Sequence, residues 1–146
     1  SKAVGAYGGY LCTSRDVADM LRNRARSLIY TTALPPGTVA AASKALEIIA
    51  TDGELTRVPL EHARHFTERL GLPQAESPIV ALLLGSAERA LAASERLENA
   101  GFLVVTIRPP TVPEGTARLR CTFSAAHEAS DVDAFAEAAR EALAAV

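Results

Sequence analysis

Two β-prone runs joined by a proline-rich loop are the feature that most restricts how this chain can fold. The runs cover residues 103–107 and 117–124, and three prolines lie in the loop between them. Proline fixes φ and has no N–H to donate to a strand ladder, so both strands must end at this loop. We therefore predict a β-hairpin that presents Arg108 at the start of a stiff loop.

A compact β-α-β-β-α unit is predicted around this hairpin, in the second half of the chain. The continuous apolar run Ile79–Leu84 has the length and composition of a buried strand. A helix capped by Ser86 should follow it, with Leu91 and Leu97 facing inward. After the hairpin, a last amphipathic helix is expected to begin at Ser130.

The first third of the chain has a different character, with helices and loops but no sheet on which they could pack. We expect a short strand at Tyr10–Thr13 and an alanine-rich helix over about residues 37–50 that stops at Asp52-Gly53. A further helix is predicted over about residues 55–70. This change of character suggests a boundary close to residue 53.

Composition excludes several classes of protein. The chain has 146 residues, a net charge of -2 and 22% charged residues, so it has no broad basic field for nucleic acid. No run reaches the about 20 apolar residues of a membrane span. The two cysteines, Cys12 and Cys121, lie far apart, which gives no metal spacing and fits a reduced, cytoplasmic protein. His62 and His65 lie outside the apolar face of their helix, so we interpret both as surface residues.

The residues able to carry chemistry have ordinary alternatives when each is considered alone. Lys2 precedes a glycine-rich run, but most lysines are simply solvated. Thr31 and Thr32 stand before a proline pair, where two hydroxyls could hold a phosphate or cap a helix. Arg108 could grip a carboxylate through two parallel hydrogen bonds, with the Thr111 hydroxyl nearby, or it could be a solvated hairpin arginine.

Taken together, three blocks of sequence resemble the α-oxoamine synthases. The blocks are residues 1–10, residues 29–36 and residues 107–127, and the last of them carries the pattern Ile-Arg-Pro-Pro-Thr-Val-Pro-x-Gly-Thr-Ala-Arg-Leu-Arg. These pyridoxal-phosphate enzymes join an amino acid to an acyl thioester. The pattern is most similar to the branch that condenses L-alanine with a pimeloyl thioester, carried by coenzyme A or acyl-carrier protein, in biotin synthesis.

The resemblance implies a role for each matching residue. Lys2 would be the catalytic lysine that holds pyridoxal 5'-phosphate and moves the substrate proton. Thr31 and Thr32 would reach the cofactor phosphate of the partner subunit in a homodimer. Arg108 would bind the amino-acid carboxylate, and Thr111 would line the substrate site.

The resemblance also implies a fold and a place within a longer chain. The fold would be the α/β C-terminal part of a fold-type I pyridoxal-phosphate-dependent transferase. Residues 1–53 would end a large cofactor-binding domain, and residues 54–146 would form a small domain with a short, mainly antiparallel sheet covered by helices. Most of the cofactor-binding segments would precede Ser1, so we expect the 146-residue chain alone to be inactive.

Three other matching residues, Arg118, Arg120 and His127, are assigned to structural or supporting roles. Two rival functions stay open. One is a sibling enzyme that uses glycine or serine, of the 2-amino-3-ketobutyrate ligase, 5-aminolevulinate synthase or serine palmitoyltransferase type. The other is a non-catalytic α/β module in which Lys2 is incidental. All three readings are free of metal and involve neither nucleic acid nor membrane.

Overall fold

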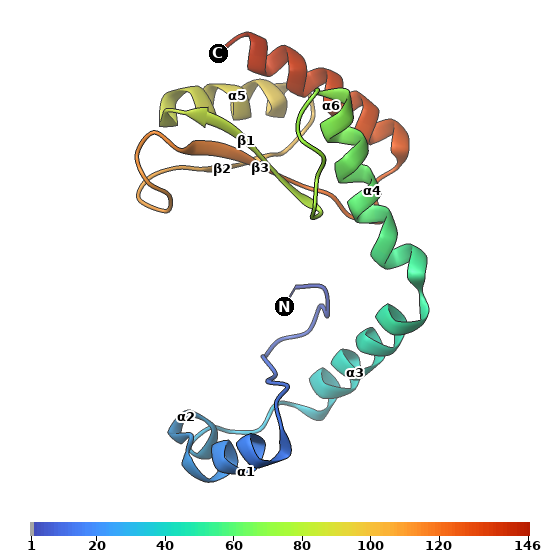
Figure 1. Ribbon diagram of the computed structural model, residues 1–146, viewed down its shortest axis with the longest axis vertical. Coiled ribbons are helices and arrows are strands. Elements are labelled where there is room, and N and C mark those ends of the chain that lie inside the picture. Colours follow the sequence, from blue (N-terminus) through green and yellow to red (C-terminus); the bar gives the residue numbers. More distant parts are fainter. Residues whose placement is uncertain (1) are drawn as a thin grey trace. The chain divides into compact units, whose positions relative to one another are not determined.

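The computed structural model describes residues 2–146, and its contacts divide the chain into two compact units that meet at Asp52 and Gly53 (Figure 1). The predicted boundary lay one residue further on. That the first unit ends a larger cofactor-binding domain remains a prediction.

The first unit is made of helices and extended segments. It contains α1 (Arg15–Arg24), α2 (Arg26–Ile29) and α3 (Pro36–Thr51). Asp16 lies in the first turn of α1 and Arg22 and Arg24 in its last, the order that the helix dipole favours. Proline suits the first turn of α3 because the N–H that it lacks would have no partner there.

The strand predicted at Tyr10–Thr13 is wrong. These residues lie outside any helix or strand, because the described part of the first unit has no second strand to pair with them. Tyr10 and Leu11 are 73% and 70% exposed. Cys12, which we expected in a strand, is also exposed.

The second unit has the predicted β-α-β-β-α order, preceded by one further helix. Its elements are α4 (Gly53–Arg69), β1 (Ile79–Gly85), α5 (Ala87–Asn99), β2 (Val105–Ile107), β3 (Ala117–Thr122) and α6 (Ala129–Ala144). The predicted hairpin is therefore present as β2 and β3, although β2 begins only at Val105.

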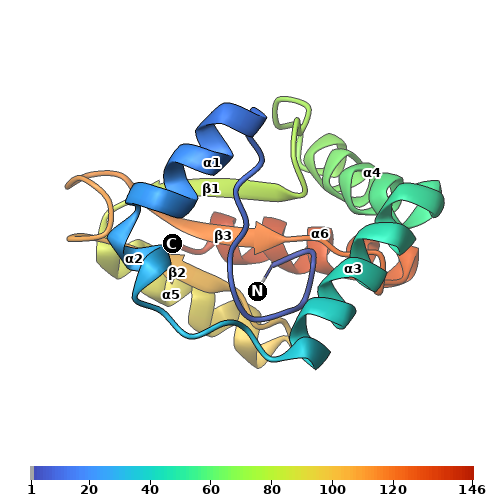
Figure 2. The same cartoon turned by 90° about the horizontal axis from the view of Figure 1, so that it is seen from below.

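The sheet is antiparallel, with β3 between β1 and β2. Leu82 of β1 lies opposite Leu119 of β3, and Ile107 of β2 lies opposite Arg118. Helix α5 connects β1 to β2 and lets them flank β3 on its two sides. Figure 2 shows α5 and α6 behind the strands, on one face of the sheet.

Because helices of the second unit cover only one face, burial alternates along the strands. Val80, Leu82 and Leu84 are buried, whereas Ile79 and Leu83 are 53% and 68% exposed. The strand predicted at Ile79–Leu84 is present, but only its alternate residues on the covered side are buried. We call the uncovered side, from which Ile79 and Leu83 project, the open face of the sheet.

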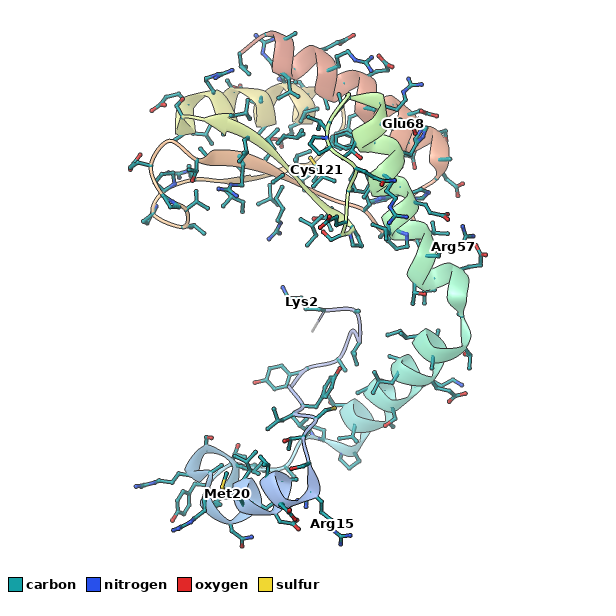
Figure 3. The ribbon with its side chains drawn as sticks, viewed as in Figure 1. Lys2, Arg15, Met20, Arg57, Glu68 and Cys121 are labelled. Atoms are coloured by element: carbon teal, nitrogen blue, oxygen red, sulfur yellow. The ribbon has the colours of Figure 1, made fainter. Side chains whose placement is uncertain are left out.

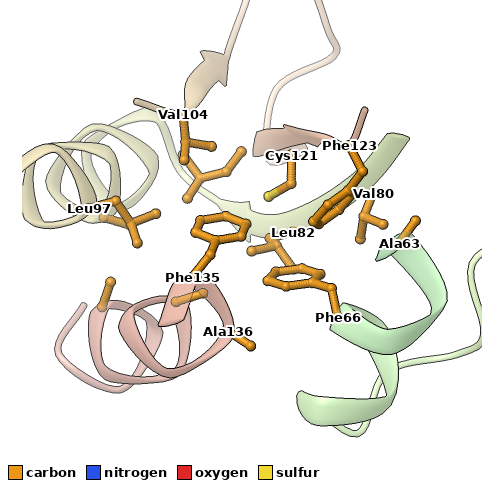
Figure 4. Close-up of a cluster of buried hydrophobic side chains, with 14 of the residues drawn as sticks. Ala63, Phe66, Val80, Leu82, Leu97, Val104, Cys121, Phe123, Phe135 and Ala136 are labelled. Atoms are coloured by element: carbon orange, nitrogen blue, oxygen red, sulfur yellow. The ribbon is translucent and has the colours of Figure 1, made fainter. Parts of the chain in front are cut away.

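The core lies between the sheet and the helices and is built around phenylalanines (Figure 4). The rings of Phe66 in α4 and Phe135 in α6 are stacked with their centroids 4.8 Å apart, and the ring of Phe123 lies 5.2 Å from that of Phe66. Small residues of α5, Ala90 and Ala93, let that helix approach closely. Leu91, which we expected to face inward, is 49% exposed.

Polar side chains fix the position of α6. Its cap is Glu128 rather than the predicted Ser130, since Glu128 and Asp131 each bond the other's backbone N–H in a capping box. His65 of α4 contacts Asp133 of α6, with 2.8 Å between Nε2 and Oδ1. Next to this pair, Arg69 Nη2 donates to Glu137 at 2.5 Å.

These contacts act on the carboxylates of α6. The hydrogen bond from His65, with the charge of Arg69 adding to it, lowers the pKa of Asp133. The pKa of Glu137 is lowered by hydrogen bonds from Arg140 and Arg69. Within residues 2–146, no helix is long and apolar enough to cross a membrane, and no cluster of three or more His, Cys, Asp or Glu side chains could hold a metal ion.

Candidate active site

The predicted site residues are divided between the two units. Lys2, Thr31 and Thr32 belong to the first unit, and Arg108 and Thr111 belong to the second.

Lys2 opens a tight turn. Its carbonyl oxygen accepts a hydrogen bond from the N–H of Gly5 at 2.9 Å, and Gly5 has the positive φ of 64° that glycine readily adopts. The lysine side chain is exposed (Figure 3). Among residues 2–146 its amine has no hydrogen-bond or ion-pair partner.

A glycine packs the lysine-bearing segment against the segment that follows the two threonines. Gly8 has φ of 119°, and a Cβ atom placed on it would lie 2.8 Å from Cδ1 of Leu34. Cδ1 is the end of a flexible side chain that could move away, so it is the positive φ of Gly8 that favours glycine here. Leu34 stands two residues after Thr32, and the two predicted cofactor segments of this unit are thereby in contact.

Thr31 and Thr32 do not cap the following helix. The N-cap of α3 is Pro35, which makes no side-chain capping bond. Both threonines are exposed, and in the described part of the chain neither hydroxyl has a hydrogen-bond partner. The capping alternative is therefore wrong, while the phosphate-binding role stays a prediction.

Arg108 is the first residue after β2, where the hairpin loop begins. Its carbonyl oxygen accepts from the N–H of Thr111 at 3.0 Å, across the cis Pro109-Pro110 bond. A second turn follows, in which the Thr116 hydroxyl donates to the carbonyl of Pro113 at 2.7 Å. These bonds define the loop, and the exposed Arg108 guanidinium has no carboxylate partner among residues 2–146.

Two further arginines of the hairpin lie on the open face of the sheet. Arg118 and Arg120 alternate with Leu119, which is fully buried on the covered face. Arg118 Nε donates to the carbonyl of Thr116 at 2.9 Å. Neither guanidinium forms an ion pair with any described residue, in contrast to Arg69 and Arg140.

The hairpin thus carries three arginines that form no ion pair with any of residues 2–146, which suits a negatively charged ligand. Sequence reasoning assigned Arg118 and Arg120 to supporting roles. Their alternation with Leu119 was a usable signal, but it does not show by itself which face of the sheet is covered.

Two other candidates near the hairpin have structural roles. Burial between sheet and helices raises the pKa of the Cys121 thiol to about 12, so this cysteine is no nucleophile (Figure 3). His127 Nδ1 lies 3.3 Å from the N–H of Ser124, from which it accepts. Its ring meets that of Phe123 edge-on, as expected for a residue that packs.

Comparison with known proteins identifies the family. The family model for class I and II aminotransferases matches residues 1–138. The chain belongs to the class I and II aminotransferase family. The predicted fold, the C-terminal part of a fold-type I transferase with a small antiparallel sheet, is confirmed by solved relatives within this family.

Two curated relatives of high identity are named as 8-amino-7-oxononanoate synthases. The chain is 64% identical over 137 residues to a putative 8-amino-7-oxononanoate synthase of Acidiphilium cryptum, covering 94% of this chain and 36% of that protein. It is 64% identical over 141 residues to the 8-amino-7-oxononanoate synthase of Methylorubrum populi, covering 97% and 36%. The chain therefore spans about a third of the length of these relatives.

Solved structures in the family have the same fold. Serine palmitoyltransferase of Sphingomonas wittichii matches with a TM-score of 0.83 at 30% identity, covering 95% of this chain and 38% of that one. An 8-amino-7-oxononanoate synthase of Francisella tularensis matches with a TM-score of 0.70 at 26% identity, covering 89% and 39%.

The cofactor of this aminotransferase family member is pyridoxal phosphate, which a matching structure of an SPT contains. The residues of the first unit suit it chemically. A primary amine can bond covalently to an aldehyde, and free hydroxyls can donate to a phosphate. Lys2, Thr31 and Thr32 supply these groups, and none of them is engaged elsewhere within residues 2–146.

Proposed function

We propose that this chain is the C-terminal part of a pyridoxal-phosphate-dependent C-acyltransferase of biotin synthesis. It would condense L-alanine with a pimeloyl thioester to give 8-amino-7-oxononanoate, carbon dioxide and the free thiol of coenzyme A or acyl-carrier protein. The observation that carries this proposal is the 64% identity, over 94% of the chain, to a curated protein of that name.

Lys2 has two tasks in this proposal. Its amine would hold the cofactor covalently, and the same amine would remove the proton from the Cα of the bound L-alanine. Pyridoxal phosphate, when bound, would supply a ring that accepts electrons. The tight turn from Lys2 to Gly5 fixes the backbone from which the amine projects.

The hairpin would bind and orient the amino acid. Arg108 can hold the alanine carboxylate through two parallel hydrogen bonds, and Arg120 offers a second exposed guanidinium on the same hairpin. Thr111 would line the site. Its N–H bonds the Arg108 carbonyl, so the two residues are positioned by one turn.

A homodimer in the cytoplasm is also part of the proposal. Thr31 and Thr32 would donate to the cofactor phosphate of the partner subunit, a role supported by their exposed hydroxyls. Sedimentation of the full-length protein at assay concentration tests this arrangement. A fully active monomer would contradict it.

The central test is turnover by the full-length protein. With L-alanine and pimeloyl-CoA we expect release of carbon dioxide and formation of 8-amino-7-oxononanoate, measured by mass spectrometry. Turnover on glycine in place of alanine would defeat the proposal and support a sibling enzyme. The isolated 146-residue chain should not turn over, and cofactor absorbance that survives its dialysis would contradict that expectation.

A serine palmitoyltransferase is the second candidate. The Sphingomonas wittichii enzyme matches with a TM-score of 0.83, above the 0.70 of the Francisella tularensis 8-amino-7-oxononanoate synthase. Identity favours the first candidate, since it is 64% to curated 8-amino-7-oxononanoate synthases and 30% to the palmitoyltransferase. Activity on L-serine and palmitoyl-CoA, with none on L-alanine and pimeloyl-CoA, would reverse that choice.

A further inference from the structure

We propose that Arg118 binds the distal carboxylate of the acyl donor, so that the open face of the sheet selects a dicarboxylic acyl chain over a monocarboxylic one. This inference rests on the proposed function and adds a determinant of acyl-chain specificity to it.

The open face combines aliphatic surface with positive charge. It is formed by alternate residues of the three strands: Ile79, Ala81, Leu83, Val105, Ile107, Arg118, Arg120 and Thr122. None of these residues is acidic. A ligand that complements this face has an apolar body and an anionic end, which describes a pimeloyl chain and does not describe an acetyl or a palmitoyl chain.

Arg118 is held in place for such an anion. Its Nε donates to the carbonyl of Thr116 at 2.9 Å, and the side chain is half-buried. The two terminal nitrogens have no partner among residues 2–146. Because one end of the guanidinium is already fixed, less rotational freedom is lost when a carboxylate binds the other end.

The neighbours of Arg118 supply the surface for methylene groups. Leu83 of β1 and Ile107 of β2 lie opposite Arg118 on its two sides. Leu83 is 68% exposed, so it offers aliphatic surface that the described part of the second unit leaves uncovered. An acyl chain that packs there would bring a terminal carboxylate to the guanidinium.

Arg120 is less suited to this task. It lies opposite Ala81 and Val105, is exposed, and has no hydrogen bond that fixes its side chain within the described residues. Arg118, whose side chain is fixed, is therefore the residue whose replacement should change kcat/KM for the acyl donor.

The test compares two thioesters of equal chain length in the full-length enzyme. Pimeloyl-CoA carries the distal carboxylate, and heptanoyl-CoA lacks it. Arg118→Gln should lower kcat/KM for pimeloyl-CoA by about 10- to 100-fold, the usual effect of one charge-assisted hydrogen bond. For heptanoyl-CoA the value should stay within about twofold, and so should the KM for L-alanine.

Two further variants complete the experiment. Arg118→Lys should restore part of the preference for pimeloyl-CoA, because it keeps the charge. The matched control is Arg96→Gln, because Arg96 is an exposed residue of α5 without an ion pair in the described residues. This variant should leave kcat/KM for both thioesters unchanged.

Each contrary result has a distinct meaning. Equal loss on both thioesters would show that Arg118 only supports the fold, and a raised KM for L-alanine would place it in the amino-acid site; either result overturns this inference alone. Failure of the unsubstituted enzyme to use pimeloyl-CoA would overturn the proposed function, and this inference with it.

Discussion

At the scale of single residues, the chain offers an internal comparison for its proposed catalytic group. It contains only two lysines, Lys2 and Lys44. Lys44 forms an ion pair with Glu47 on the surface of α3, with 2.8 Å between Nζ and Oε1. Lys2 has no such partner within residues 2–146, so the two amines differ in whether a carboxylate is paired with them.

Replacing Lys2 with alanine in the full-length enzyme should lower turnover by about 10²- to 10⁴-fold, because a general base and the point of cofactor attachment are both lost. Lys44→Ala should retain turnover within about twofold. Borohydride reduction followed by mass spectrometry should find cofactor bonded to the Lys44→Ala protein and none on the Lys2→Ala protein. Undiminished activity of Lys2→Ala would support a non-catalytic module.

Individual site residues could be predicted from sequence only where the local pattern was sufficient. Arg108 follows a strand and precedes prolines, and the structure places it at the start of the hairpin loop. The partner of His65 could not be predicted in this way, since Asp133 lies 68 residues further along the chain. Such a contact depends on how α4 and α6 pack, which neither local sequence contains.

At the scale of elements, the two faces of β3 have different roles. The face toward the helices contributes to stability, and the open face carries the arginines of the proposed ligand site. Leu119 is fully buried against the helices, and Leu103, outside the strand, is 87% exposed. Leu119→Ala should cost about 2–5 kcal/mol of unfolding free energy because it leaves a cavity in a packed core. Leu103→Ala should cost less than about 0.5 kcal/mol.

Thermal and urea unfolding of the intact protein measures both leucine variants. An equal loss of unfolding free energy in the two variants would contradict the burial of Leu119 in β3.

The contact between α4 and α6 should make stability depend on pH in acid. The pKa of Asp133 is lowered in the folded protein, mainly by the hydrogen bond from His65. Its contribution is therefore complete above the ordinary pKa of aspartate and is lost as pH falls through the lower folded pKa. Asp133→Asn should flatten the decline in stability between about pH 5 and pH 2.

Glu98→Gln on α5 is the control for that variant, because the Glu98 carboxylate forms no ion pair with any described residue. Urea unfolding across this pH range distinguishes the two variants. A decline that is equally steep in the Asp133→Asn protein would show that the contact with His65 does not matter for stability.

The order of the elements in the second unit could be predicted because each has its own period and end signals. Which residues are buried could not be predicted in the same way, and Ile79–Leu84 shows the reason. An apolar run reads the same whether both faces of its strand are covered or only one. The exposed half of this run is understandable only once the sheet is seen to carry helices on one side.

At the scale of the whole molecule, the two units differ in whether they have a core. Every buried side chain among residues 2–146 lies at or after Ala63, and α1, α2 and α3 contain none. We expect residues 53–146 alone to fold cooperatively and residues 2–52 alone to remain largely unfolded, because too little apolar area is removed from water to offset chain entropy.

Circular dichroism and thermal melting of the two separate pieces test this difference. A cooperative melt of residues 2–52 would contradict it. Absence of such a melt for residues 53–146 would show that the aromatic core around Phe66 and Phe135 is insufficient without the rest of the protein.

The strict alternation along β3 has a consequence for how this family can tolerate changes of length. Removing one residue early in this strand would move every later side chain to the opposite face of the sheet. Arg120 would then point into the hydrophobic core and Cys121 toward the solvent. Point substitutions can therefore accumulate in the central strand one at a time, whereas a single-residue deletion would damage folding and ligand binding together.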